Sequence, residues 1–437
     1  MVEIKETGCA CGKAHRCAVN NVIIGKGVVE KLPEEIKKMG ATKPFVLCDV
    51  NTDRAAGQTV SVILEKAGIP YSKYVIAKDH SEPDEETVGA VFMHFDPSCD
   101  LVLAVGSGVI GDVSKIVATV AKLGYMIVAT APSMDGYASA TSSMARDGVK
   151  VSLPTKCPEV IIGDVDILKE APAEMLKSGL GDMLAKYISL AEWRIARLLV
   201  GEYYCEDIAE LMRECLRACS DNADGLLKRE DAAVEAVFQG LVQAGLAMSY
   251  ADCSRPASGV EHYFSHVWDM RALEFGDACS THGIQVAIGT LYSARLYEKL
   301  KTVTPDVKKG IASVEAFSKD GWFEELSGFL GSSAQAMIRL DAKEQKYDPE
   351  THKVRLVKIV ENWDEILRII DEEIPTAAEL EALLDRIECP KRPSEIGIDE
   401  ALLPITFKAT KDIRDKYILP RLLWDLGLLD EMADTLA

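Results

Sequence analysis

Three of the seven histidines of this chain lie within 21 residues, as His262, His266 and His282. His262 and His266 are four residues apart, so on a helix their side chains share one face. Neutral imidazole is the commonest metal ligand, and histidine alone has an unperturbed pKa near physiological pH. This window therefore predicts metal binding or proton transfer, and the alternative is a set of satisfied core or surface histidines.

A second group of metal-ligand types lies near the N-terminus, as Cys9, Cys11, His15 and Cys17. The residue types suit zinc, but the spacing differs from the paired C-x2-C units of common zinc modules. Two cysteines one residue apart are also awkward for closing a tetrahedron. A structural or regulatory metal stays open as an interpretation, and we favour an ordered, metal-free N-terminal arm.

The chain has 437 residues, enough for two or three domains, and 48% of them are hydrophobic. Its net charge of −20 argues against nucleic-acid binding, which requires a basic face. No apolar run reaches the roughly 18–20 residues of a spanning helix, and the charged N-terminus does not look like a secretory signal. We therefore expect a cytoplasmic protein without membrane insertion, whose twelve cysteines are mostly reduced.

The first third of the chain alternates short β-branched runs with helical patterns, as parallel α/β sheets do. Strands are expected at 21–25, 44–49, 73–77, 101–105, 125–130 and 160–164, and helices at 28–39, 59–67 and 84–95. After about residue 167 the patterns are long and amphipathic. The sequence predicts an α/β nucleotide-binding domain with a parallel sheet in residues 1–167, including an N-terminal arm at 1–20. An all-helical domain that binds metal and substrate is expected in residues 168–437.

A glycine-rich segment follows the fourth expected strand and runs into a helix: Gly106, Ser107, Gly108, Val109, Ile110, Gly111 and Asp112. Glycines let the backbone approach a pyrophosphate, and a helix N-terminus supplies free N–H groups. The segment has the G-x-G-x-x-G form, but it follows the fourth strand instead of the first and lacks the acidic residue expected about 20 positions later. A tight turn without a ligand is the alternative.

Two further segments end expected strands, where parallel sheets bind ligands. Asp49 could contact a ribose hydroxyl, which would favour NAD over NADP, or it could cap a helix. Residues 130–139 form a loop of small residues that could hydrogen-bond a nicotinamide or a polyol, and a hydrophilic loop without a ligand is the alternative.

Together these segments resemble the sn-glycerol-1-phosphate dehydrogenases, including the AraM-type proteins. These belong to the superfamily of iron-type alcohol dehydrogenases, glycerol dehydrogenase and dehydroquinate synthase. The matching blocks, in family order, are Gly106–Asp112, Thr130–Gly136, Ser178–Tyr187, Ser254–His266 and Thr281–Gly283. The resemblance implies a dehydroquinate synthase-like fold and a place in phospholipid metabolism.

The resemblance also implies one divalent metal bound by Asp182, His262 and His282, with Asp182 in a glycine-rich turn at a helix start. Four-ligand members of the superfamily carry a histidine four residues after this aspartate, whereas this chain has Lys186. We therefore expect a three-ligand site, with zinc as the first choice and nickel and iron as alternatives. Such a metal would act as a Lewis acid on the C2 ketone while the nicotinamide delivers hydride.

The remaining roles follow from the same resemblance. Asp135, His266 and Asp182 would face the substrate, and either Asp135 or His266, or a water, would supply the proton. The cofactor, NAD or NADP, would lie against Gly106, Gly108, Val109, Ile110, Gly111, Asp112, Thr130, Ala131, Pro132, Ser133 and Ser139, with Asp49 nearby. Ser107 departs from the glycine of the family loop. Our first candidate for the substrate phosphate is Arg255, with Lys186 second, and a structural salt bridge is the alternative for Arg255.

We therefore expect a metal-dependent NAD(P)-linked enzyme that interconverts dihydroxyacetone phosphate and sn-glycerol 1-phosphate. The alternatives are a dehydrogenase for glycerol or another small polyol, a dehydroquinate synthase-like lyase, and a non-enzymatic nucleotide or metal sensor. The expected partner is a small phosphorylated polyol, and the chain is expected to form a homo-oligomer.

Overall fold

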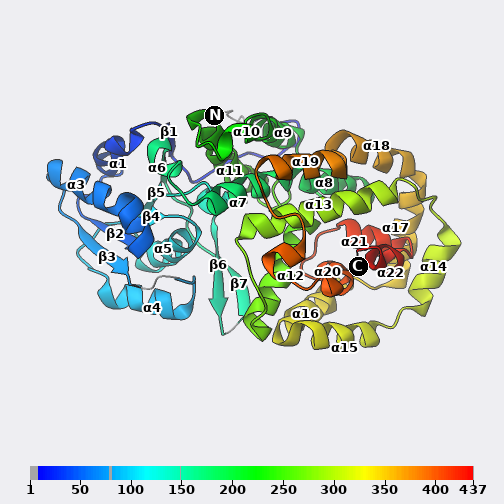
Figure 1. The fold of residues 1–437 in the computed structure, drawn as a ribbon. Helices are drawn as coiled ribbons and strands as arrows, with labels where there is room; N and C mark the ends of the chain where they lie inside the picture. Colours follow the sequence, from blue (N-terminus) through cyan, green and yellow to red (C-terminus); the bar gives the residue numbers. More distant parts are fainter. Residues whose placement is uncertain (1–7, 78–80, 148, 437) are drawn as a thin grey trace. The chain divides into compact units, whose positions relative to one another are not determined.

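A computed structural model describes residues 8–77, 81–147 and 149–436. The chain divides into two compact units. The first comprises Met1–Met183 with Glu210–Cys253, and the second Leu184–Ala209 with Ser254–Ala437. Sheet gives way to helix after residue 164 (Figure 1), but the helical segment 210–253 packs with the sheet. The change in secondary structure and the division into units therefore fall at different residues.

The first unit contains a six-stranded, fully parallel sheet in the order β1-β8-β5-β4-β2-β3. Its strands are β1 (Asn21–Gly25), β2 (Pro44–Asp49), β3 (Ser72–Ile76), β4 (Leu101–Gly106), β5 (Gly124–Ala129) and β8 (Val160–Asp164). All six strands were expected from the sequence, because β-branched runs buried on both faces give a strong signal. The predicted parallel α/β class is confirmed.

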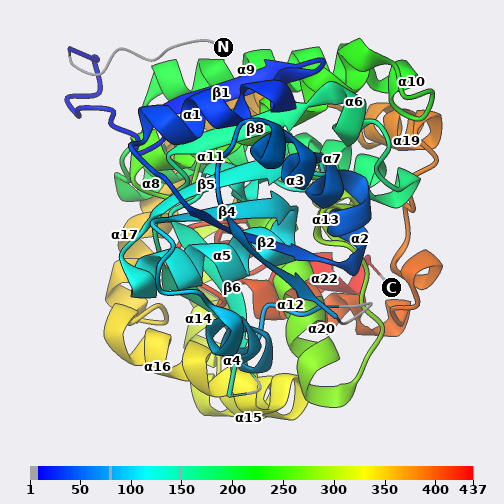
Figure 2. The same ribbon diagram turned by 90° about the vertical axis from the view of Figure 1, so that its left-hand side faces the viewer.

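Helices cover both faces of this sheet. One face carries η1 (Val28–Lys31), α1 (Leu32–Lys38) and α3 (Gln58–Lys66), of which α1 and α3 are labelled in Figure 2. Their apolar side chains form one core with alternate residues of the central strands. The helices α4 (Glu85–His94), α5 (Gly108–Ala121) and α11 (Asp231–Ala251) pack on the other face. The short helices of this unit are α2 (Val50–Thr52), η2 (Asp53–Gly57), η3 (Asp135–Ala138), α6 (Val165–Leu168) and α10 (Ala223–Leu226).

One β-hairpin was not expected. β6 (Thr141–Arg146) and β7 (Val149–Pro154) pair antiparallel in a separate two-stranded sheet. β6 buries only Ser142 and Met144, so its sequence lacks the apolar alternation that marks a strand. Two long helices, α7 (Ala173–Leu184) and α9 (Glu206–Asp221), cross the boundaries between the two units.

The helix α11 is long and apolar enough to span a membrane by length and composition alone, although no segment of this kind was expected from the sequence. In the structure, 67% of its apolar window is buried within the protein. Phe238 of this helix packs against Gly163 of β8, where an added Cβ would lie 2.1 Å from the ring. Its apolar surface is therefore used as that of a core helix.

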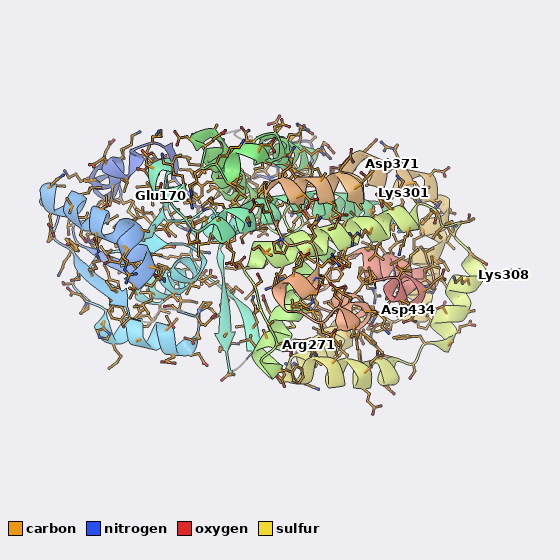
Figure 3. All side chains as sticks on the ribbon, in the orientation of Figure 1. Glu170, Arg271, Lys301, Lys308, Asp371 and Asp434 are labelled. Atoms are coloured by element: carbon orange, nitrogen blue, oxygen red, sulfur yellow. The ribbon has the colours of Figure 1, made fainter. Side chains whose placement is uncertain are left out.

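The second unit is helical, as expected. Its longest helices are α8 (Lys186–Val200), α12 (Val260–Phe275) and α13 (His282–Leu300). The others are α14 (Val307–Ala316), α15 (Lys319–Leu330), η4 (Gly331–Ser333), α16 (Ala334–Glu344), α17 (Pro349–Glu361), α18 (Trp363–Glu373), α19 (Ala377–Arg386), η5 (Pro393–Ile396), η6 (Glu400–Leu402), α20 (Leu403–Thr410), α21 (Leu419–Asp425) and α22 (Leu429–Asp434). Ion pairs join some of them at the surface, as Lys301 after α13 and Asp371 of α18 do (Figure 3).

Candidate functional site

The glycine-rich segment lies where the order of the strands in the sheet reverses. Strands β2 and β3 lie on one side of β4, and β5 and β8 lie on the other. In open parallel sheets such a switch point forms a ligand crevice outside the carboxyl ends of the strands. The position of the segment after the fourth strand is therefore the position that this topology requires.

Two glycines of the segment have different reasons to be glycine. A Cβ on Gly106 would lie 2.5 Å from Cβ of Ile110, so packing of β4 against α5 excludes any larger residue. A Cβ on Gly108 would meet nothing closer than 3.7 Å, at Met134. Gly108 is the first residue of α5, and its lack of a side chain leaves the helix N-terminus open to a ligand.

Ser107, the departure from the family pattern, connects this segment to the loop after β5. Its Oγ lies 2.5 Å from Oγ of Ser133 and 3.2 Å from the hydroxyl oxygen of Tyr137. That hydroxyl also lies 2.6 Å from the carbonyl oxygen of Ala131. The serine hydroxyl therefore fixes the two candidate cofactor loops to each other, a role that a glycine could not perform.

Lys115 is a buried cation that the sequence interpretation assigned no role. Its Nζ donates to the carbonyl oxygens of Gly136 and Thr141, at 2.7 and 3.1 Å, and lies 3.3 Å from Oδ1 of Asp112. Burial raises the pKa of Asp112, and the charge of Lys115 opposes that shift. A lysine on the inner face of α5 was the available signal, because such a residue is seldom buried without partners.

The other cofactor candidates lie at the carboxyl ends of neighbouring strands. The amide of Thr130 donates to the carbonyl of Gly106 at 3.1 Å, which joins the ends of β5 and β4. Asp49, at the end of β2, caps α2 by accepting the Thr52 amide at 2.7 Å. The capping alternative is therefore present, through Oδ1. Ser139 follows η3, and its hydroxyl contacts Thr141.

The helix α7 holds the loop after β5 through one face. Ser178 Oγ donates to the carbonyl of Ser133 at 2.9 Å, and Oδ2 of Asp182 accepts the Asp135 amide at 2.8 Å. Asp182 is fully buried and lies in the last turn of α7, so its expected place at a helix start is wrong. Gly179 lies within this helix, and only glycine fits there because the Pro132 carbonyl occupies the place of a side chain.

We predict that Gly179→Ala destabilises this unit by more than about 1–3 kcal/mol, the usual cost of overpacking. Its Cβ would lie 1.8 Å from the carbonyl oxygen of Pro132, and a backbone atom cannot rotate away. The matched control is Gly89→Ala in α4, where a Cβ meets nothing within 4 Å. The Gly89→Ala variant should be more stable than the wild type by about 0.5–1 kcal/mol, because alanine has the higher helix propensity. Equal unfolding midpoints for both variants would contradict this packing.

In the second unit the histidine window forms a cluster on α12 and α13. The ring centroids of His262 and His282 are 5.2 Å apart, and one nitrogen of each ring lies within 4.8 Å of the other. His262 is 5% exposed, and its Nδ1 lies 2.8 Å from Oε1 of Glu261. His282 Nδ1 lies 3.1 Å from the Ser265 hydroxyl. A hydrogen-bond partner on Nδ1 of each ring is the arrangement found in metal-binding histidines, which coordinate through the other ring nitrogen.

His266 differs from the other two histidines. It is half-buried, with its ring 5.9 Å from that of Tyr263 and 6.4 Å from that of His282. The two histidines at spacing four therefore differ in their surroundings. A carboxylate fixes His262, whereas the ring of His266 lies beside the rings of Tyr263 and His282.

Two buried carboxyl groups lie beneath His262. Glu261 accepts the Gly259 amide at 2.6 Å as well as His262, and Glu192 of α8 accepts the amides of Val260 and Leu419 at 3.0 and 2.8 Å. Burial, and then the charge of Glu261, raises the pKa of Glu192 to about 8. The Glu-His pair was visible in the sequence, but nothing in it marked Glu192 as its neighbour.

Arg255 and Lys186 are both buried. Arg255 uses Nε and Nη2 on the carboxylate of Glu202, with Nε at 2.6 Å from Oε2. The salt bridge that we kept as the alternative is therefore present. Within the described part of the chain, Nη1 is buried without a hydrogen-bond partner. Lys186, at the first position of α8, is fully buried.

We predict that Glu192→Gln flattens the pH dependence of stability. Because the folded pKa lies above the ordinary value of 4.5, the stability that Glu192 contributes is complete below about pH 4.5. It is lost as pH rises toward about 8, by up to about 1.4 kcal/mol per unit. The free energy of unfolding of the variant should therefore rise relative to that of the wild type as the pH increases across this range.

The measurement is the denaturant midpoint of both proteins at several pH values after chelation, because a cation on His262 would lower the same pKa. Comparing the two proteins cancels all other titrating groups. A difference that stays constant from pH 5 to pH 9 would show that Glu192 is ionised throughout.

The chain is similar to several curated proteins named glycerol-1-phosphate dehydrogenase [NAD(P)+]. It is 32% identical to that of Bacillus velezensis over 324 residues, which cover 72% of this chain and 82% of the relative. It is 34% identical to that of Bacillus licheniformis, covering 68% and 76%, and 32% identical to that of Pyrococcus horikoshii, covering 63% and 78%. Residues 23–172 match the family model described as iron-containing alcohol dehydrogenase.

Solved structures show the same fold at low sequence identity. Glycerol dehydrogenase from Schizosaccharomyces pombe aligns with a TM-score of 0.61 and 17% identity, over 96% of this chain and 90% of that one. Maleylacetate reductase from Agrobacterium tumefaciens gives a TM-score of 0.63 and 13% identity, over 97% and 98%. By its sequence relatives and its fold, the chain belongs to the glycerol-1-phosphate dehydrogenase family of the iron-type alcohol dehydrogenases.

Proposed function

We propose that this chain is a metal-dependent, NAD(P)-linked oxidoreductase that interconverts dihydroxyacetone phosphate and sn-glycerol 1-phosphate. The observation that carries the proposal is the pair His262 and His282, each with Nδ1 engaged and with ring nitrogens close together. Relatives named for this activity, in bacteria and archaea, support the choice of substrate. The twelve cysteines all lie in the described residues and form no disulfide there, which agrees with a reducing compartment, and we propose the cytoplasm.

We assign the metal to Asp182, His262 and His282, with zinc as the first choice. The donor set fits, because one carboxylate and two imidazoles are ordinary zinc ligands, and Nδ1 of each histidine has a hydrogen-bond partner as in known metal sites. A divalent cation bound there would supply Lewis acidity to the substrate ketone. Glu261 orients His262 and strengthens it as a ligand, since a carboxylate on the far nitrogen fixes the tautomer.

The chain's own residues position the cofactor and supply the proton. The loops after β4 and β5, joined through Ser107 and Ser133, would hold NAD or NADP at the N-terminus of α5. Asp49 retains Oδ2 for a ribose hydroxyl, since Oδ1 caps α2. His266 or Asp135 would give the proton that completes the alcohol when hydride reaches C2, and would take it back in the reverse direction.

We predict that His282→Ala abolishes turnover and lowers the metal content, while NADH binding and the fold of the sheet unit persist. His266→Ala is the matched variant and should keep the metal and lose about 10²–10⁴-fold in kcat. The measurements are metal analysis, NADH fluorescence titration and NADH oxidation with dihydroxyacetone phosphate. Retained turnover with unchanged metal content in His282→Ala would refute the ligand assignment.

The identity of the substrate is tested by the same assay with free dihydroxyacetone and by chiral analysis of the product. Preference for the phosphorylated ketone and formation of sn-glycerol 1-phosphate would support the proposal. Equal use of the free ketone would instead indicate a small-polyol dehydrogenase, and NADH binding without oxidation would indicate a sensor.

We further propose that Nη1 of Arg255 binds the substrate phosphate, because this donor is buried and unsatisfied in the described structure. Arg255→Lys should then raise KM for dihydroxyacetone phosphate at least about tenfold, since a charged hydrogen bond is worth about 1.5–3 kcal/mol. Turnover of free dihydroxyacetone should change little. Glu202→Gln, which weakens the ion pair but keeps the guanidinium, is the control. Equal losses with both substrates in both variants would mean that Arg255 is only structural.

A further inference from the structure

The N-terminal arm carries a group of ligand types that the proposed reaction does not use. Ligand atoms of Cys9, Cys11 and His15 all lie within 4.8 Å of one another. Cys11 Sγ lies 3.4 Å from Nε2 of His15. With zinc bonds of about 2.3 Å to sulfur and 2.0–2.1 Å to nitrogen, a tetrahedral site sets this distance at about 3.6 Å.

A turn of the backbone brings the two cysteines together. The Gly12 amide donates to the carbonyl of Cys9 at 3.1 Å, and Gly12 has φ +80, a conformation that favours glycine. The chain therefore turns between Cys9 and Gly12, and His15 comes back close to both cysteines. The one-residue spacing, which argued against a tetrahedral site, places both sulfurs on the same side once this turn is made.

The surroundings favour thiolates. The Cys11 amide donates to Sγ of Cys9, and the Lys13 amide donates to Sγ of Cys11, each at 3.4 Å. Hydrogen bonds to the charged form of a group stabilise that form. Two thiolates would also offset the charge of a divalent cation, which lowers the cost of holding it at this half-buried position.

His15 is held as a metal-binding histidine is held. It is 2% exposed, and its Nδ1 lies 3.0 Å from the carbonyl oxygen of Tyr250. A carbonyl can only accept, so Nδ1 carries the proton, and in the neutral ring Nε2 presents its lone pair beside Cys11. A backbone carbonyl on the far nitrogen is the usual support of a ligating histidine. This carbonyl lies in the last turn of α11.

We propose that Cys9, Cys11 and His15 bind a second divalent metal, a structural zinc that fixes the N-terminal arm to the end of α11. The anchored helix end is itself connected to a candidate cofactor segment, because Ser249 Oγ donates to the carbonyl of Ala138 at 3.4 Å. The soft ligands select zinc over the hard cations magnesium and calcium. This site does not depend on the proposed activity.

The test is cobalt substitution of the intact protein. Thiolate-to-cobalt charge transfer should appear in the near-ultraviolet spectrum, because the proposed catalytic ligands include no sulfur. The band should persist in His282→Ala, which separates this proposal from the catalytic one. X-ray absorption of the zinc-loaded wild type should show sulfur neighbours as well as nitrogen. Absence of both the band and the sulfur shell would overturn the proposal without any variant having to fold.

Variants then identify the ligands. Cys11→Ser and His15→Ala should each lose one equivalent of zinc and the charge-transfer band, with a lower unfolding temperature. The matched control is Cys17→Ser, a half-buried thiol of the same segment outside the cluster, which should keep both. Unchanged metal content in Cys11→Ser and His15→Ala, or loss of the band in Cys17→Ser, would overturn the assignment.

Discussion

The buried carboxyl group of Glu192 is the interaction on which the helical unit depends most. It accepts hydrogen bonds from the amides of Val260 and Leu419 and from the hydroxyl of Tyr297. These partners belong to the start of α12, the start of α21 and the last turn of α13. A single side chain thus fixes the entry of the histidine helix, and a buried polar group satisfied on all sides specifies one arrangement.

Gly259 makes this arrangement possible. A Cβ there would lie 2.5 Å from Oε2 of Glu192 and 2.7 Å from Oε2 of Glu261, so the two carboxyl groups enclose the position. Glu261 in turn orients His262. Burial, and then the nearby charge of Glu261, raises the pKa of Glu192. Burying these two carboxyl groups costs electrostatic free energy, and the result is that the imidazole of His262 has a fixed orientation.

In the sheet unit, other contacts hold the candidate cofactor segments in place. Hydroxyls and a buried cation connect backbone segments: Ser107 joins the two candidate cofactor loops, and Lys115 holds the carbonyls that follow. The helix α7 packs against the same region through Gly179 and positions Asp182. Loops that bind ligands usually need such anchoring, since they have no ladder of their own to order them.

The sequence by itself determined the parallel sheet, the helical second half, the family and the residue types that carry chemistry. Periodicity and strand-end glycines are local signals, and they survive without knowledge of the partners. The tertiary structure decided what depends on distant neighbours. It gave Lys115 and Glu192 their partners, formed the hairpin of β6 and β7, placed Asp182 within a helix, and brought Cys9, Cys11 and His15 together. These features arise from contacts between segments far apart in the chain, or from a single left-handed glycine, and neither leaves a repeating pattern in the sequence.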